Sequence, residues 1–264
     1  MSDAIFSASR RTSMLALLGL AAGCGGGSGD PTPMAGSVQM RDITSSHNGT
    51  AYPLYLYLPR DAQVDRSTLP TVYLLDGESR FQTMVDIAEA TRTRVIIVAI
   101  GNEAQRARDY VPSNLCTANG GGEAAFLAFI RLELIPFIDS TFGGDPKKRA
   151  LLGHSHGGSF VLYALFAEPP GARLFSAYLA SDASIDCMRA TVYAWESDYA
   201  AAHTALPVRV HLSYGANFAN EPFGAQLASR SYPDLRLAVM GYAGGHIGMI
   251  PAAFTDALAF AWAA

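Results

Sequence analysis

Charge and cysteine are both scarce in this sequence. Only 16% of the 264 residues are charged, the net charge is −4, and three residues are cysteine. This balance lacks the basic footprint that nucleic-acid-binding proteins carry, so we expect no nucleic-acid partner. Half of the residues are hydrophobic, which is enough to bury a sizeable core within one domain.

The apolar run near the N-terminus is too short to cross a bilayer. Arg10 and Arg11 precede this run, residues 14–22, and small residues end it. Such an arrangement is typical of a signal peptide, which we place at residues 1–23. The Leu-Ala-Ala-Gly-Cys sequence ending at Cys24 resembles a bacterial lipobox, which implies lipid attachment at Cys24. An ordinary secreted protein and an uncleaved anchor are the alternatives.

A stretch containing Gly and Pro, residues 24–35, follows and is typical of a flexible tether. We therefore expect the folded domain to occupy residues 36–264. We predict an exported bacterial protein, either a lipoprotein anchored in a membrane through Cys24 or a periplasmic or secreted protein. In such an oxidising compartment the other two cysteines, Cys116 and Cys187, form either a disulfide or two unpaired thiols.

Strand patterns alternate with helical patterns along the expected domain. Two alternating runs, residues 38–45 and 51–58, flank an Asn-Gly turn and predict an antiparallel hairpin at a sheet edge. Continuous apolar runs, each followed by a helix-compatible segment, are typical of parallel strands covered on both faces. These runs are residues 71–75, 95–100, 150–152, 177–180, 208–213 and 235–239. The sequence predicts a three-layer α/β fold whose mostly parallel sheet has an antiparallel N-terminal hairpin and helices on both faces.

A G-x-S-x-G pentapeptide, Gly153-His154-Ser155-His156-Gly157, lies between an apolar run and a helix-compatible run. Strand, tight turn and helix around a serine are typical of a nucleophile elbow, which exposes the serine hydroxyl above the sheet. The glycines allow strand and helix to approach closely. The alternative is a glycine-rich turn with an idle serine. We interpret Ser155 as the candidate nucleophile.

A serine hydroxyl needs a base within hydrogen-bonding reach, and the base needs a group that orients it. Of the six histidines, His246 follows the last strand in a Gly-rich loop and fits the chain order serine, acid, histidine of α/β-hydrolases. The acid is expected after the strand at residues 208–213, where Glu221 is the favoured candidate. Asp182, which follows the preceding strand, and a serine–histidine pair without a strong acid are the alternatives.

An oxyanion hole requires two backbone N–H donors beside the nucleophile. His156, the residue after the serine, is expected to supply one donor. The turn after residues 71–75 is expected to supply the other through Gly77 or Glu78. The His-Ser-His sequence has no spacing typical of zinc ligands, so we expect neither a metal nor another cofactor.

Three further motifs accompany the elbow: Leu74-Leu75-Asp76-Gly77-Glu78, Arg108-Asp109-Tyr110-Val111-Pro112 and Gly245-His246. In this order they resemble the putative esterase family of the α/β-hydrolase superfamily, the group of enterochelin esterases, feruloyl and acetylxylan esterases and S-formylglutathione hydrolases. The resemblance implies an α/β-hydrolase fold, with Ser155 as nucleophile, His246 as base and Gly77–Glu78 beside the oxyanion. It also places Cys116 and Cys187 on one rim of the site, which favours the disulfide.

The chain departs from the family pattern at two places. Relatives often carry the acid directly after the glycine that follows the strand at residues 208–213, whereas Ala and Asn follow Gly215 here. Relatives show Ser-Pro-Ser after the strand at residues 177–180, where this chain has Ser181-Asp182-Ala183-Ser184. The identity of the acid therefore stays open among the alternatives named above.

Together these residues predict a serine carboxylic-ester hydrolase that acts through an acyl-enzyme on an extracytoplasmic ester. The candidate substrates are a siderophore trilactone, a feruloyl or acetyl ester linked to a polysaccharide, and a small short-chain ester. Two alternatives on the same fold are a lipid-anchored binding protein without turnover and an acyltransferase.

Overall fold

A computed structural model of the chain describes residues 36–60, 65–113 and 115–263. The predicted signal peptide, the tether and the lipidation residue Cys24 lie outside the described residues. Within these ranges, no helix has both the length and the apolar character needed to cross a membrane.

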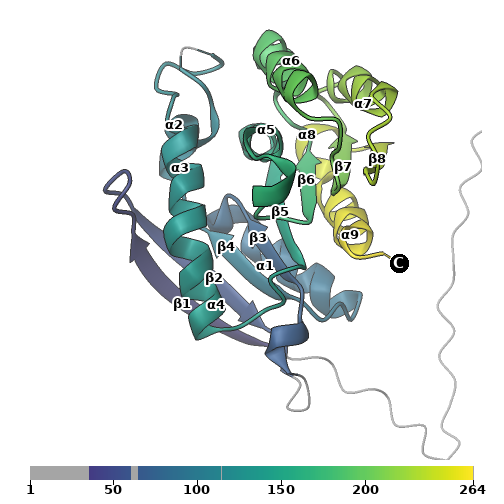
Figure 1. The fold of residues 1–264 in the computed structure, drawn as a ribbon. Coiled ribbons are helices and arrows are strands. Elements are labelled where there is room, and N and C mark those ends of the chain that lie inside the picture. The colour runs from purple at the N-terminus through teal and green to yellow at the C-terminus, as the bar shows by residue number, and fades with distance from the viewer. Residues whose placement is uncertain (1–35, 61–64, 114, 264) are drawn as a thin grey trace, which may run out of the picture. The chain divides into compact units, whose positions relative to one another are not determined.

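The described strands form one eight-stranded sheet in the order β1-β2-β4-β3-β5-β6-β7-β8 (Figure 1). The predicted hairpin is present as β1 (Ser37–Thr44) and β2 (Ala51–Leu58), and Gly49 in its turn has a φ of 70°. β2 pairs antiparallel with β4, and every later pair is parallel. The parallel strands are β3 (Thr71–Leu74), β4 (Ile96–Ile100), β5 (Arg149–His154), β6 (Ala177–Ser181), β7 (Arg209–Tyr214) and β8 (Arg236–Gly241).

Helices cover both faces of the sheet, and a separate hydrophobic cluster lies on each face. On one face, α1 (Gly77–Ala90) and α9 (Ile250–Ala261) bury residues such as Met84 and Phe254. The other face is covered by α3 (Glu123–Phe129), α4 (Ile135–Thr141), α5 (His156–Ala167), α6 (Ile185–Ala202) and α7 (Asn220–Ser229). Two short helices, α2 (Arg106–Tyr110) and α8 (Gly245–Gly248), lie in loops between larger elements. The predicted α/β-hydrolase fold is confirmed.

The helical stretch over residues 123–141 is interrupted by a π-helical turn, Ile130–Leu134, between α3 and α4. Pro136 lies in the first turn of α4 and has no N–H to donate to a carbonyl one turn earlier. The wider turn accommodates this missing donor, and the N–H of Ile135 binds the carbonyl of Ile130 instead.

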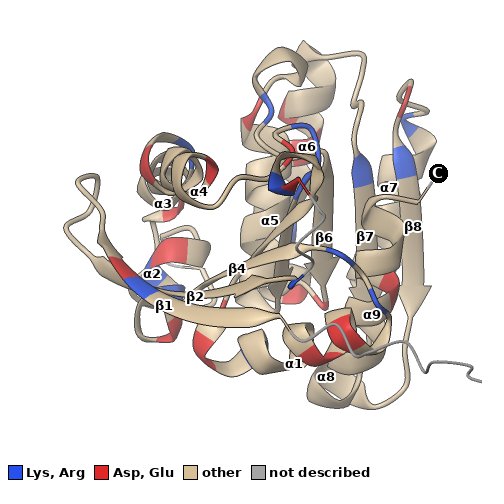
Figure 2. Cartoon of the chain, turned by 90° about the horizontal axis from the view of Figure 1, so that it is seen from below, with Lys and Arg blue, Asp and Glu red and all other residues tan. Residues whose placement is uncertain are grey.

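Lysine and arginine residues are dispersed among the described elements rather than gathered into one stripe (Figure 2). A protein that follows a nucleic-acid backbone presents such a basic stripe. Neither the dispersed arrangement of these side chains in the described residues nor the slightly negative net charge of the chain is typical of such a protein.

The middle of β7 contains a buried histidine whose protonation should make folding pH-dependent. His211 is 1% exposed, and burial lowers its pKa to about 4. In the unfolded chain a histidine has a pKa near 6.5, so below that pH the unfolded state binds a proton that the folded state refuses. We expect His211 to lower the free energy of unfolding by about 1.4 kcal/mol per pH unit as the pH falls from 6.5 towards 4.

Urea unfolding at several pH values checks this expectation. His211→Phe should flatten the decline over this range, whereas His47→Gln, which removes an exposed histidine of the hairpin turn, should not. An unchanged slope in His211→Phe would show that another group causes the acid sensitivity.

Candidate active site

Ser155 occupies a strained turn between β5 and α5. Its φ of 61° lies in a region that residues other than glycine rarely adopt, and its N–H donates a hydrogen bond to the carbonyl of Ser181. A Cβ on Gly153 would lie 2.4 Å from the carbonyl oxygen of Gly157, so a side chain at that position would clash with the first turn of α5. The sequence motif therefore forms the expected nucleophile elbow at the carboxyl edge of the sheet.

His246 lies in α8, close to the elbow. The preceding Gly244 has a φ of 99°, which only glycine adopts readily, and this turn brings the helix back over the strand ends. The ring of His246 lies 4.5 Å from that of His154, measured between centroids. His154 is 2% exposed, and burial lowers its pKa to about 3, so it packs against His246 as an uncharged ring.

Asp182 orients His246. Its Oδ2 atom lies 2.5 Å from Nδ1 of His246, and the carboxyl group is fully buried at the end of β6. The other oxygen, Oδ1, accepts hydrogen bonds from the N–H groups of Gly215, Ala216 and Asn217, at 2.8, 3.1 and 2.9 Å. The loop after β7 thus surrounds an acid that the preceding strand supplies.

The pKa of Asp182 reflects two opposing influences. Burial by itself raises the pKa, but hydrogen bonds from His246 and from the backbone of residues 215–217 outweigh it and lower the pKa below its ordinary value. The carboxyl group is therefore ionised at neutral pH and holds the Nδ1–H of His246. This leaves Nε2, the opposite ring nitrogen, free to accept a proton.

The preference for Glu221 as the acid is not supported by its position. Glu221 is exposed in the first turn of α7, and its neighbour is Tyr214, whose pKa is raised by desolvation and by the charge of Glu221. Asp182 occupies the place beside His246 instead. The physical reason is that the β7–α7 loop places no carboxylate of its own beside the histidine and instead donates its backbone N–H groups to Asp182.

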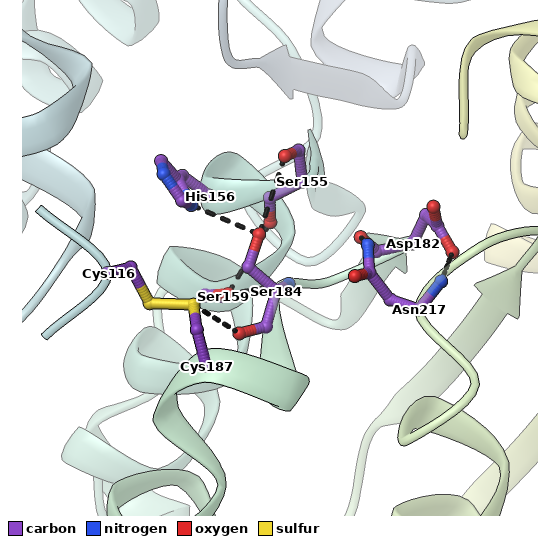
Figure 3. Close-up of a disulfide and its surroundings, with 8 residues drawn as sticks. All are labelled: Cys116, Ser155, His156, Ser159, Asp182, Ser184, Cys187 and Asn217. Carbon is purple, nitrogen blue, oxygen red and sulfur yellow. Dashed lines mark hydrogen bonds between the residues drawn. A yellow bond between two sulfur atoms is a disulfide. The ribbon is translucent and has the colours of Figure 1, made fainter.

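Ser155 and His246 line one cavity of about 350 Å³. Within the described part of the chain the Ser155 hydroxyl contacts Ser184 Oγ at 3.4 Å, and no hydrogen bond joins it to His246. Ser184 Oγ lies 3.0 Å from Nδ1 of His156, so these three residues form a chain of polar contacts (Figure 3). Hydrogen bonds between catalytic groups commonly tighten only when substrate is bound.

The expected oxyanion donors belong to the starts of two helices. His156 is the first residue of α5 and Gly77 the first of α1, so neither N–H has an acceptor within its helix. The residue before α1, Asp76, lines the cavity, whereas Gly77 and Glu78 are not among the described residues that do. The Glu78 carboxylate accepts a hydrogen bond from the N–H of Glu103.

The chain also matches a known protein family by sequence. A model of the family described as putative esterase matches residues 45–206, which is more than half of the chain. This chain belongs to the putative esterase family. It is therefore a carboxylic-ester hydrolase, and the resemblance carried by the elbow and the accompanying motifs is confirmed.

Individual relatives of this esterase act on siderophores, according to their names. The siderophore triacetylfusarinine C esterase of Aspergillus fumigatus is 33% identical over 59% of this chain, and the match spans only 58% of that relative. The ferri-bacillibactin esterase BesA of Bacillus subtilis is 26% identical over 84% of this chain and 89% of its own. A crystal structure of an IroE-like serine hydrolase from Shewanella oneidensis has a TM-score of 0.75 at 24% identity, covers 84% of this chain and 79% of its own, and shares the fold.

A disulfide joins Cys116 to Cys187 beside the site of this esterase, as the resemblance led us to expect. Cys116 belongs to the loop between α2 and α3, and Cys187 to the first turn of α6. The Cys187 sulfur lies 3.4 Å from the carbonyl of Ser184, the residue whose hydroxyl contacts Ser155 (Figure 3). The bridge therefore ties a rim loop to the segment that carries Ser184 and Asp182.

Removing the bridge should destabilise the domain. It closes a loop of 71 residues, and the chain-entropy relation gives about 4 kcal/mol for a loop of that length. We expect Cys116→Ser/Cys187→Ser to lower the free energy of unfolding by roughly this amount in urea titrations. Dithiothreitol should produce the same loss in the wild type and none in the double variant. Equal stability of the two proteins would contradict this expectation.

Further polar residues line the cavity without a role predicted from their place in the sequence. Asp76 is 3% exposed and accepts two hydrogen bonds from the guanidinium of Arg106, both 3.1 Å long. Arg80, on the first turns of α1, lines the same cavity. Within the described residues, no group of three or more His, Cys, Asp or Glu side chains could hold a metal ion.

Proposed function

We propose that this esterase cleaves its substrate through an acyl-enzyme, with Ser155 as nucleophile, His246 as general base and Asp182 as the orienting acid. The observation that carries the proposal is the contact of 2.5 Å between Asp182 Oδ2 and His246 Nδ1, beside the cavity that Ser155 also lines. A buried, ionised acid on Nδ1 fixes the histidine tautomer that can accept a proton on Nε2.

The reaction begins when Ser155 Oγ attacks the ester carbonyl carbon while His246 Nε2 takes the hydroxyl proton. The tetrahedral intermediate then collapses, the bond from carbon to the alcohol oxygen breaks, and His246 gives its proton to the leaving alcohol. Water attacks the acyl carbon and passes a proton to His246. The second collapse releases the carboxylic acid and returns the proton to Ser155.

We assign the oxyanion hole to the N–H of His156 and to an N–H at the start of α1, from Gly77 or Glu78. Both donors are fixed before substrate arrives, because each belongs to the first turn of a helix anchored on a buried strand. Preorganised donors of this kind stabilise the developing negative charge without reorganisation during the reaction.

We assign siderophore esters as the substrate class. Curated relatives that match this chain are named as esterases of triacetylfusarinine C and of ferri-bacillibactin, and the second match covers most of both chains. The catalytic cavity is lined mainly by polar and charged residues, which suits a substrate rich in oxygen atoms.

A substrate panel tests this assignment. Residues 36–264 should hydrolyse a catecholate trilactone and a hydroxamate triester with higher kcat/KM than 4-nitrophenyl butyrate or an acetylated xylan. Product analysis by mass spectrometry, with and without an added alcohol, should show the free acid as the main product. Preference for the xylan ester would reject the siderophore assignment, and transfer to the alcohol would reject hydrolysis.

We also propose that the protein is exported and anchored through a lipid on Cys24, on the strength of the lipobox-like sequence alone. Cells fed an alkyne fatty acid should label the full chain and recover it in the membrane fraction. Cys24→Ala should lose the label and the membrane association. A wild-type chain without label in a bacterial host would overturn the anchor.

A further inference from the structure

Arg80 places a positive charge on the wall of the catalytic cavity without a carboxylate to neutralise it. Among the described residues it forms no ion pair, and its Nε atom is buried without a hydrogen-bond partner. A buried donor without an acceptor costs free energy, and a guanidinium presents its donors in a fixed planar fork. The residue therefore faces the cavity with unused hydrogen-bonding capacity.

Several other arginines of this fold are paired with acids. Arg106, which lines the same cavity, is held by Asp76, and its charge is neutralised there. Further examples of such pairs are Arg108–Asp109, Arg131–Glu168, Arg149–Asp139 and Arg230–Glu196. Arg173 also has buried nitrogens without a hydrogen-bond partner, but it does not line this cavity. Of the two arginines among the described residues that line the cavity, Arg80 is the one without a carboxylate partner.

The acids near Arg80 do not neutralise it. Asp76 is occupied by Arg106, and Glu103, which also lines the cavity, is exposed and makes no ion pair with Arg80. The charge of Arg80 does reach the elbow, since after burial and the charge of His246 it helps to lower the pKa of His154. A negatively charged group inside the cavity would therefore meet Arg80 close to Ser155.

We propose that Arg80 is a specificity-determining residue that binds an anionic group of the substrate, so that the esterase prefers esters with a carboxylate or a comparable oxyanion near the scissile bond. The inference rests on the proposed function of Ser155 and His246. A carboxylate or catecholate offers two acceptor oxygens that match the guanidinium fork. Contact made equally in the ground and transition states lowers KM more than it raises kcat.

Matched pairs of esters test the proposal on both sides of the scissile bond. Mono-4-nitrophenyl glutarate against 4-nitrophenyl pentanoate places the charge on the acyl side, and 4-acetoxybenzoate against its methyl ester places it on the alcohol side. The readout is the ratio of kcat/KM for the anionic ester to that for its neutral partner. We expect Arg80→Gln to lower this ratio at least about tenfold for one pair, mainly through KM.

Two further variants sharpen the comparison. Arg80→Lys keeps the charge without the fork and should restore part of the ratio. Arg66→Gln removes an exposed arginine before β3, at the opposite edge of the sheet, and should leave both ratios unchanged. Ratios in Arg80→Gln equal to those of the wild type for both pairs would overturn the proposal.

A binding measurement separates failure of this inference from failure of the proposed function. Calorimetric titration of Ser155→Ala with glutarate and with 4-hydroxybenzoate needs no turnover. Adding Arg80→Gln to that variant should weaken the tighter of the two anions about tenfold. If the wild type hydrolysed no ester, the proposed function would fail while this titration still decided the role of Arg80. Equal affinities with and without Arg80 would reject it.

Discussion

Ser155→Ala should lower kcat for ester hydrolysis by about 10⁴-fold or more, with KM changed only slightly. In the proposed mechanism Oγ of Ser155 forms the covalent bond to the acyl group, so no other step can proceed without it. The cavity keeps its shape, because the alanine side chain fits wherever the serine Cβ does. The elbow should still fold, since its φ of 61° is imposed by β5 and α5.

Steady-state kinetics with 4-nitrophenyl acetate and a siderophore ester checks this expectation, and Ser140→Ala on α4 is the matched control. Ser140 is exposed and donates a hydrogen bond to the carbonyl of Phe137, away from the cavity lining, so its loss should leave kcat unchanged. Turnover in Ser155→Ala within about tenfold of the wild type would show that a different nucleophile, or directly activated water, hydrolyses the ester.

Asp182→Asn should lower kcat by about 10³- to 10⁴-fold, whereas Glu221→Gln should leave it within about twofold. An asparagine can still accept hydrogen bonds from the N–H groups of Gly215 and Asn217 through its carbonyl oxygen. Its amide group would then face Nδ1 of His246 and favour the tautomer whose Nε2 carries the proton. That tautomer cannot accept a proton from Ser155.

The comparison of the two variants decides the identity of the acid. Circular dichroism and thermal unfolding of Asp182→Asn should show a folded protein, so that lost turnover reports chemistry. The pKa of Asp182 is lowered in the fold, so the stability that its ionised form contributes is present above pH 4 and is lost as the pH falls through the folded pKa. A larger loss in Glu221→Gln than in Asp182→Asn would restore the acid after β7.

The fold, the candidate nucleophile and the candidate base could be predicted because local patterns specify them. The elbow needs glycine at positions 153 and 158 for steric reasons, and those glycines are visible in the sequence. His246 could be recognised from its place after the last strand pattern. The alternation of apolar runs and helical segments was sufficient for the sheet, since parallel strands covered on both faces read as continuous apolar stretches.

The acid was harder to predict because its partners come from a different part of the chain. Asp182 is held by the backbone of residues 215–217, and backbone donors leave no signature in side-chain identity. Glu221 had the expected place in the chain order, but helix α7 carries it outward. The useful signal was the pair of departures from the family pattern: no acid after Gly215, and an aspartate directly after β6.

The position of Arg80 in the cavity wall could not be predicted from the sequence for a related reason. Its sequence position is that of an ordinary charged residue in the first turns of a helix, where solvent exposure is the usual outcome. Only the arrangement of strands brings this turn of α1 against the elbow. Because Asp76 is paired with Arg106, Arg80 is left without a counter-ion among the residues that the structure describes.

Peptide mapping after reaction with a fluorophosphonate would identify the nucleophile of this esterase. The reagent forms a covalent bond with a serine that a neighbouring base activates. The account predicts one adduct per chain, on the peptide that contains Ser155, blocked by a substrate ester and formed much more slowly in Asp182→Asn. An active enzyme whose Ser155 stays unlabelled, or an adduct on another residue that abolishes turnover, would contradict the account.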